Sequence, residues 1–328
     1  MRKIILLLLI LFASVGMACS SMPSWTNDPY SGYSKADFIC AVGFGKTQAE
    51  ADMEAKKEIA GFFGTSVSAN TEVSSSESSS SGFSSSFSSK ASAQVNADDI
   101  VGIEIDKRYS EGKQFVSHAV LEKKSAITFY AGQIMNYITK TTNSEGFIKE
   151  DMGSMYALAD LSDLVEAYNG YQKSLRIYNA LSSTPFVSVL TEVPDISLIS
   201  QQVFSSIEVT VKVSGDVDGR IESAIKAFLT ECGLSIARRR SRNVVDVSIT
   251  LEESEVKGNP YKFCRYSMKV SIVDETFEEQ VFEFSASGKE GQNSYDQAKT
   301  RAVNTLEKMF KNEFADKFEE KFGIRPNK

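Results

Sequence analysis

The stretch A41-V-G-F-G-K-T-Q-A-E50 raises the first question about this chain, because Gly45-Lys46-Thr47 matches the end of a phosphate-binding loop. The full loop reads G-x-x-x-x-G-K-[ST], and its first glycine would fall at position 40, which is Cys40. A dinucleotide-binding G-x-G-x-x-G would need a third glycine where Gln48 stands. The stretch therefore predicts no nucleotide site.

The same residues are typical of a turn between a strand and a helix. The apolar run Phe38–Phe44 predicts a buried strand. Thr47 and Glu50 have the spacing of a capping box, which satisfies backbone N–H groups at a helix start. A helix is expected over Thr47–Phe62, with apolar residues at every fourth position along one face.

Two alternating runs and a serine-rich tract follow this helix. Val67–Val73 and Ala91–Ala97 alternate with a period of two, which predicts extended strands. Between them, the serine-rich segment 74–90 is interpreted as a solvated loop. The alternative is one long hairpin over residues 65–97 that turns at Ser81-Gly82.

A hairpin completes the first domain, and a second domain lies towards the carboxy terminus. Ser110–Lys113 contains a glycine turn between two alternating runs. Two helices follow, Ser125–Lys140 and Lys149–Leu181, with a break at Asn143–Gly146. The last domain is predicted as strand, helix, three-stranded meander and closing helix over these ranges: Ile207–Val217, Gly219–Cys232, Val244–Lys257, Tyr261–Asp274, Glu278–Ser287 and Ser294–Phe322.

The expected fold class is therefore α+β, with two antiparallel-sheet-plus-helix domains joined by a helical hairpin. The domain boundaries are a signal peptide at 1–18, a tether at 19–36, a first domain at 37–124, a hairpin and linker at 125–206 and a last domain at 207–328.

The amino terminus has the pattern of a secretory signal. Arg2 and Lys3 precede ten apolar residues, too few to cross a bilayer, which needs about 20. Ala18-Cys19 then resembles the lipobox of bacterial lipoproteins, although Gly16 stands where that family usually has leucine. The resemblance implies that Cys19 is acylated and becomes the mature amino terminus, so that acyl chains anchor the protein to a membrane.

The net charge argues against one class of partner, and the cysteines have few possible roles. The chain carries a net charge of −7, which argues against nucleic acid as a partner. The basic run Arg238–Arg242 is predicted to be a solvated turn between strands. Cys40 is expected to pack as a small apolar residue, and Cys232 and Cys264 either form a disulfide or stay free.

The sequence predicts no enzyme, no cofactor and no metal site. His118 is the only histidine, and alternation places it beside Val116 and Val120 on one strand face, which favours a structural role. The pairs Glu252-Glu253 and Glu278-Glu279 fall at predicted strand ends and indicate solvated edges. No nucleophile elbow or metal-ligand spacing occurs.

Several features together resemble the LPP-twenty family of bacterial envelope lipoproteins over Pro23–Lys140. They are the Pro23-Ser24-Trp25 motif near Cys19, the strand ending in AVGFG, the alanine-rich helix, the serine-rich stretch and the hairpin. The resemblance implies an outer-membrane anchor facing the periplasm and no known catalytic residues. By element order alone, the last domain is similar to TolB-type and curli-channel-type periplasmic modules.

We therefore expect a non-enzymatic envelope lipoprotein that presents its domains to envelope proteins or to the cell wall, as a monomer or homo-oligomer. A carrier of a small apolar ligand is one alternative. A curli-channel-like oligomeric pore built from a hairpin at 65–97 is another. Lipid-facing strands place apolar side chains outward, and only Phe83 and Phe87 supply such bulk in the serine tract.

Overall fold

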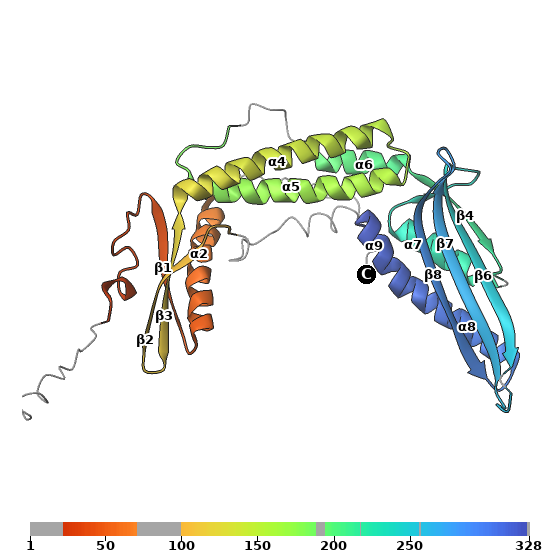
Figure 1. Ribbon diagram of the computed structural model, residues 1–328. Helices are drawn as coiled ribbons and strands as arrows, with labels where there is room; N and C mark the ends of the chain where they lie inside the picture. Colours follow the sequence, from red (N-terminus) through yellow and green to blue (C-terminus); the bar gives the residue numbers. More distant parts are fainter. Residues whose placement is uncertain (1–21, 71–99, 188–193, 217, 256, 327–328) are drawn as a thin grey trace, which may run out of the picture. The chain divides into compact units, whose positions relative to one another are not determined.

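The computed structural model describes residues 22–70, 100–187, 194–216, 218–255 and 257–326 (Figure 1). The described residues divide into two compact units. The first contains residues 22–70, 100–128 and 180–182, and the second contains the remainder, so one boundary falls between Thr128 and Phe129 inside a long helix. Each unit contains its own sheet and helices, so the predicted α+β class is confirmed. The predicted acylation site Cys19 and the serine-rich segment 74–90 lie outside the described residues.

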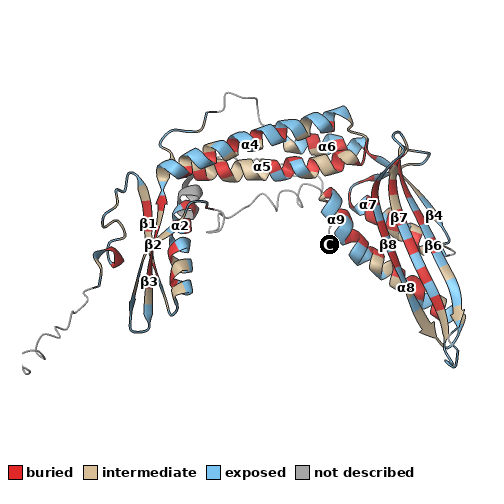
Figure 2. Ribbon diagram, viewed as in Figure 1, coloured by how far each residue is buried: buried red, intermediate tan, exposed pale blue. Residues whose placement is uncertain are grey.

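The first unit is a three-stranded antiparallel sheet with a helix on one face. Its elements are η1 (Ser24–Thr26), β1 (Phe38–Gly45), α2 (Gln48–Asn70), β2 (Glu104–Glu111) and β3 (Gln114–Glu122), and β3 is the central strand. The predicted apolar face of α2 is confirmed, because its residues at every fourth position are completely buried: Ala51, Ala55, Ile59 and Phe63. Figure 2 colours the exposed side of α2 pale blue.

Two glycines let α2 lie directly on β1. A Cβ atom at Gly43 would stand 2.1 Å from the Ala55 nitrogen, and one at Gly45 would stand 2.5 Å from the Ala51 nitrogen. The glycines of the quoted stretch therefore serve close backbone packing between strand and helix.

The predicted cap of α2 is present. The Glu50 N–H donates to the Thr47 hydroxyl at 3.2 Å. The Glu50 carboxylate accepts from the Lys46 N–H at 2.8 Å, one residue before the usual partner in a capping box.

Two predictions for this unit need correction. Residues Thr65–Asn70 belong to α2, so the expected strand and the first arm of the hairpin at 65–97 do not begin there. Extending an existing helix by further residues is favourable, and the period-two pattern of small residues does not override it. The remainder of both alternating runs lies outside the described residues.

The second correction concerns the predicted tether at 19–36. Its described part, Met22–Ala36, packs on the sheet and is called the strap below. Trp25 and Thr26 of the strap are buried. The strap contacts His118, whereas α2 contacts the neighbouring Ser117. Because successive strand residues point to opposite faces, the strap covers the face of the sheet that α2 leaves open.

Three helices follow β3 along the chain: α4 (Lys123–Glu150), α5 (Tyr156–Leu181) and α6 (Ile196–Ser206). The predicted break at Asn143–Gly146 is wrong, because α4 continues through it and the chain turns only after Glu150. Ile148, beyond the predicted break, is fully buried in the core. That packing outweighs the roughly 1 kcal/mol that a glycine costs inside a helix.

The second sheet has the order β5-β4-β6-β7-β8 and is mixed. β6, β7 and β8 form the predicted antiparallel meander, whereas β4 runs parallel to β5 and β6 because α7 connects it across one face. The bounds are β4 (Glu208–Ser214), α7 (Arg220–Glu231), β5 (Ser235–Ile236), β6 (Asn243–Glu255), β7 (Lys262–Asp274) and β8 (Glu279–Gln292).

A π turn inside the closing helix keeps its phenylalanines on one side. The closing helix consists of α8 (Tyr295–Met309), a π turn η3 (Phe310–Phe314) and α9 (Ala315–Phe322). Side chains four residues apart drift by about 40° per step on an α-helix. One extra residue in the π turn rotates the following side chains back by about 100°. Phe310, Phe314, Phe318 and Phe322 are consequently all buried.

A polar network fastens the α4–α5 turn to the second sheet. Arg242 donates to Asp151 at 2.5 Å and to Asp274 at 2.6 Å. Asn243 donates to the Gly153 carbonyl, and Ser154 donates to Asp274. Burial acts to raise the pKa of Asp274, but the hydrogen bonds, above all those from Arg242, outweigh burial and lower it.

Candidate functional site

The only histidine of the chain lies in a closed polar cluster beneath the strap. The His118 ring is completely buried. Its Nε2 atom lies 2.7 Å from the Pro29 carbonyl oxygen, and its Nδ1 atom lies 3.4 Å from Asp106 Oδ2. The rings of Trp25 and Tyr33 flank it, with centroids 5.6 Å and 5.5 Å away. An irregularity in the pairing of β2 with β3 at Ile105–Lys107 aims the Asp106 side chain into the cluster.

The protonation of this cluster fits a structural role. The hydrogen bond to Asp106 raises the pKa of Tyr33 to about 12. Burial acts to raise the pKa of Asp106, yet hydrogen bonds from Tyr33 and Lys107 lower it overall. Burial also raises the pKa of the Cys40 thiol to about 11, so this sulfur is protonated and a poor nucleophile near neutral pH. The contacts of Pro29, Trp25 and Tyr33 with His118 hold the strap to the sheet.

A second polar cluster lies on the α2 side of the same sheet. Asp52 accepts hydrogen bonds from Arg108, Ser117 and Gln48 at 2.5 to 3.2 Å. The hydrogen bond from Arg108 is the main cause that lowers the pKa of Asp52 to about 2. Ser117 and His118 point to opposite faces, so the nucleophile and base of a catalytic triad do not meet here.

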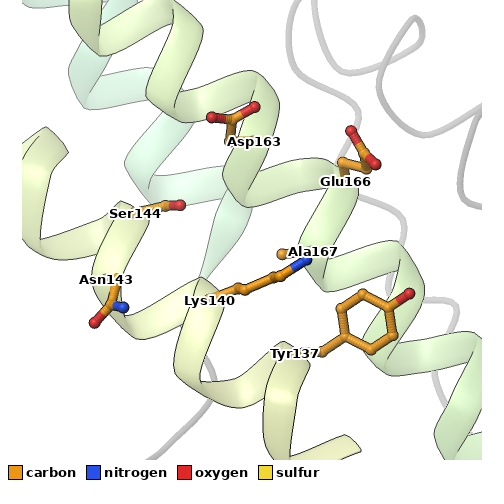
Figure 3. A pocket seen from close by; sticks show the side chains of 7 residues that line it. All are labelled: Tyr137, Lys140, Asn143, Ser144, Asp163, Glu166 and Ala167. Carbon is orange, nitrogen blue, oxygen red and sulfur yellow. The ribbon is translucent and has the colours of Figure 1, made fainter. Parts of the chain in front are cut away.

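The second unit has a hollow of about 380 Å³ between α4 and α5 (Figure 3). It is lined by Tyr137, Lys140, Asn143, Ser144, Asp163, Glu166 and Ala167. Lys140, Asp163 and Glu166 are exposed, so the hollow is a polar surface depression and offers little apolar wall to a small apolar ligand. Tyr137 closes one end by packing against Gly170, where a Cβ atom would stand 2.3 Å from the ring.

Neither a metal-ligand group nor a disulfide is present among the described residues. No group of three or more histidine, cysteine, aspartate or glutamate side chains in this part of the chain is placed to hold a metal ion. Cys232 and Cys264 are both buried and free. Cys232 follows α7 close to β5, whereas Cys264 pairs with Glu253, ten residues along β6 from Asn243. At about 3.3 Å per residue, that places the two sulfurs near opposite ends of the sheet, so they do not pair.

The basic run divides between the surface and the interior. Arg238, Arg239 and Arg240 are exposed between β5 and β6, as predicted, whereas Arg242 belongs to the network of Asp151 and Asp274. Arg240 pairs with Glu275. In the described ranges, no helix is both long and apolar enough to pass through a membrane.

Comparisons with known proteins give only distant structural similarities. No family model and no curated protein matches the chain. The motif resemblance to the LPP-twenty family therefore stays a resemblance. The chain is similar to a secreted protein, HP1454, from Helicobacter pylori, with 10% identity, a TM-score of 0.40 and coverage of 83% of this chain and 96% of that one.

Two bacterial lipoproteins are similar to parts of the chain. A minor lipoprotein from Acinetobacter baumannii has 12% identity and a TM-score of 0.26, and covers 37% of this chain and 97% of its own. The lipoprotein GNA1162 from Neisseria meningitidis has 17% identity and a TM-score of 0.22, and covers 30% of this chain and 96% of its own. Similarities at these scores assign no function to the chain.

The residues that hold the strap were not predicted as a group. Pro29 and Tyr33 come from the segment predicted as a polar tether, and Asp106 comes from one arm of the predicted hairpin. The available signal was the density of aromatic residues in a stretch otherwise rich in serine, with Trp25, Tyr30 and Tyr33 within nine positions. Aromatic side chains usually bury large areas, so such a cluster favours a packed segment over a free tether.

Proposed function

We propose that this protein is a membrane-anchored envelope lipoprotein with a structural or assembly role and no enzymatic activity. The observation that carries the proposal is Cys19 directly after Ala18, at the end of a charged and then apolar segment. Two or three acyl chains, at about 0.8 kcal/mol per buried CH₂ group, would anchor the chain stably. The outer membrane, facing the periplasm, is the proposed location.

The described side chains support a non-enzymatic role. The one histidine is buried under the strap, and Cys40 and Cys232 have pKa values raised by burial to about 11 and about 12. The hollow between α4 and α5 contains charged surface groups but no nucleophile next to a base. The partners we propose are envelope proteins or the cell wall, together with other copies of this chain.

The test is fractionation of cells grown with radiolabelled palmitate. Wild-type protein should carry label and partition into the detergent phase, whereas Cys19→Ser should carry none and appear as soluble or unprocessed chain. Cys40→Ser is the matched control and should keep the label, because Cys40 is buried within β1. Equal labelling and partitioning of wild type and Cys19→Ser would refute the lipid anchor.

A further inference from the structure

We propose that the first unit lies directly on the membrane surface, with the strap facing the lipid headgroups. This inference rests on the proposed acylation of Cys19. It goes beyond that acylation by assigning the strap as a contact surface for phospholipid.

The number of residues between acylated Cys19 and the fold limits the distance between the first unit and the bilayer. Five residues separate Cys19 from Trp25, the first buried residue of the strap. The six Cα-to-Cα steps between them span at most about 23 Å. A free tether over 19–36 would instead reach about 60 Å. The strap therefore shortens the tether to a length that keeps the domain beside the bilayer.

The strap is firmly held, so the tether does not lengthen by release of the strap. Trp25 is only 8% exposed, and the Pro29 carbonyl lies 2.7 Å from a ring nitrogen of buried His118. The Lys123 ammonium donates to the Lys35 carbonyl at 2.7 Å and fixes the far end of the strap. Peeling the strap away would expose the indole ring and remove the Pro29 carbonyl from the Nε2 atom of the buried histidine.

The side chains on the outer surface of the strap are of types that contact phospholipid headgroups. The Lys35 ammonium lies 5.0 Å from the centre of the Tyr30 ring. Beside the strap, the Lys107 ammonium of β2 lies 4.9 Å from the centre of the Tyr33 ring and pairs with Asp106. Met22 is exposed at the start of the strap. Tyrosine rings and lysine ammonium groups are enriched where proteins meet the membrane interface, because the rings are amphipathic and the ammonium groups bind lipid phosphate.

The experiment uses the full-length lipoprotein in vesicles of phosphatidylcholine and phosphatidylglycerol that contain a headgroup-nitroxide lipid. Trp25 is the only tryptophan and reports on the strap without labelling. The comparison variant has a spacer of 20 glycine and serine residues inserted between Ser21 and Met22, which adds about 25 Å of root-mean-square reach. We expect strong quenching of Trp25 in the wild type and at least a threefold smaller effect in the spacer variant.

A second pair of variants tests which face meets the membrane. A dye is attached at Asn27→Cys on the strap or at Glu58→Cys on α2, both exposed positions, while the described native cysteines are buried. The dye at position 27 should be quenched at least twofold more than the dye at position 58. Equal quenching at the two positions would overturn the assignment of the strap as the contact surface.

The outcomes separate this inference from the lipid anchor. If the wild type and the spacer variant both float with the vesicles but are quenched equally, the anchor stands and the close docking is wrong. If neither variant floats with vesicles, the anchor itself fails.

Discussion

Replacing Gly43 with alanine tests whether the glycines of the A41–E50 stretch serve packing. The added Cβ atom would stand 2.1 Å from the Ala55 nitrogen and 2.4 Å from the Ala51 oxygen. An unstrained contact needs about 3.5 Å, so α2 would have to move by roughly 1.4 Å. Overpacking typically costs about 1–3 kcal/mol, and here the contact is with backbone atoms that cannot rotate away. We expect a loss of at least about 3 kcal/mol in the stability of the first unit.

The assay is urea unfolding followed by the fluorescence of Trp25, which reports on the first unit alone. Gly61→Ala is the matched control, because it lies in the same helix and a Cβ atom there meets nothing within 4 Å. It should stabilise the helix by up to about 1 kcal/mol. If Gly43→Ala unfolds within about 0.5 kcal/mol of the wild type and instead removes a measurable affinity for nucleotide, the packing explanation is refuted.

Two further substitutions and one deletion test other parts of the fold. Thr47→Ala should lower stability by about 1 kcal/mol through the lost cap, and calorimetry should detect no ATP binding before or after; micromolar binding that Lys46→Ala removes would contradict this. Arg242→Ala should lower the free energy of unfolding by about 2–3 kcal/mol. This loss is smaller than that expected for breaking a fully buried ion pair, because the arginine side chain is 27% exposed. The pKa of Asp274 is lowered in the folded state, so ionised Asp274 stabilises the fold above about pH 4 and this stabilisation is lost as the pH falls further. In urea titrations from pH 7 to 3, the stability of Arg242→Ala should therefore depend less on pH than that of the wild type. Deleting Glu77–Phe87 should shift the melting temperature by only a few degrees, because loop-closure free energy changes by about 0.6 kcal/mol per doubling of length; detergent-stable rings with bilayer conductance, both lost on deletion, would favour the pore.

The sequence predicts correctly the helices and strands that are determined by residues close together in the chain. The cap at Thr47 and the four-residue spacing on α2 specify a strand–turn–helix unit without help from distant residues. The meander of β6, β7 and β8 follows from alternation interrupted by turn residues. The phenylalanines from Phe310 to Phe322 recur at every fourth position of the predicted closing helix and are buried in the core.

Features that depend on distant contacts were missed. Gly146 predicted a helix end, but Ile148 is buried against residues far along the chain, and this packing decides the length of α4. The parallel pairing of β4 with β6 depends on the path of α7 across the sheet, which no local pattern records. The polar composition of the strap predicts a tether, whereas its fixation by His118 and Asp106 connects residues about 80 positions apart along the sequence.

The most direct test of the lipoprotein assignment is the mass of the amino-terminal peptide of protein extracted from membranes. The peptide should begin at Cys19, lack residues 1–18 and carry the added mass of two or three acyl chains. A mature amino-terminal peptide without lipid, or one that begins at any residue other than Cys19, would contradict the lipoprotein assignment.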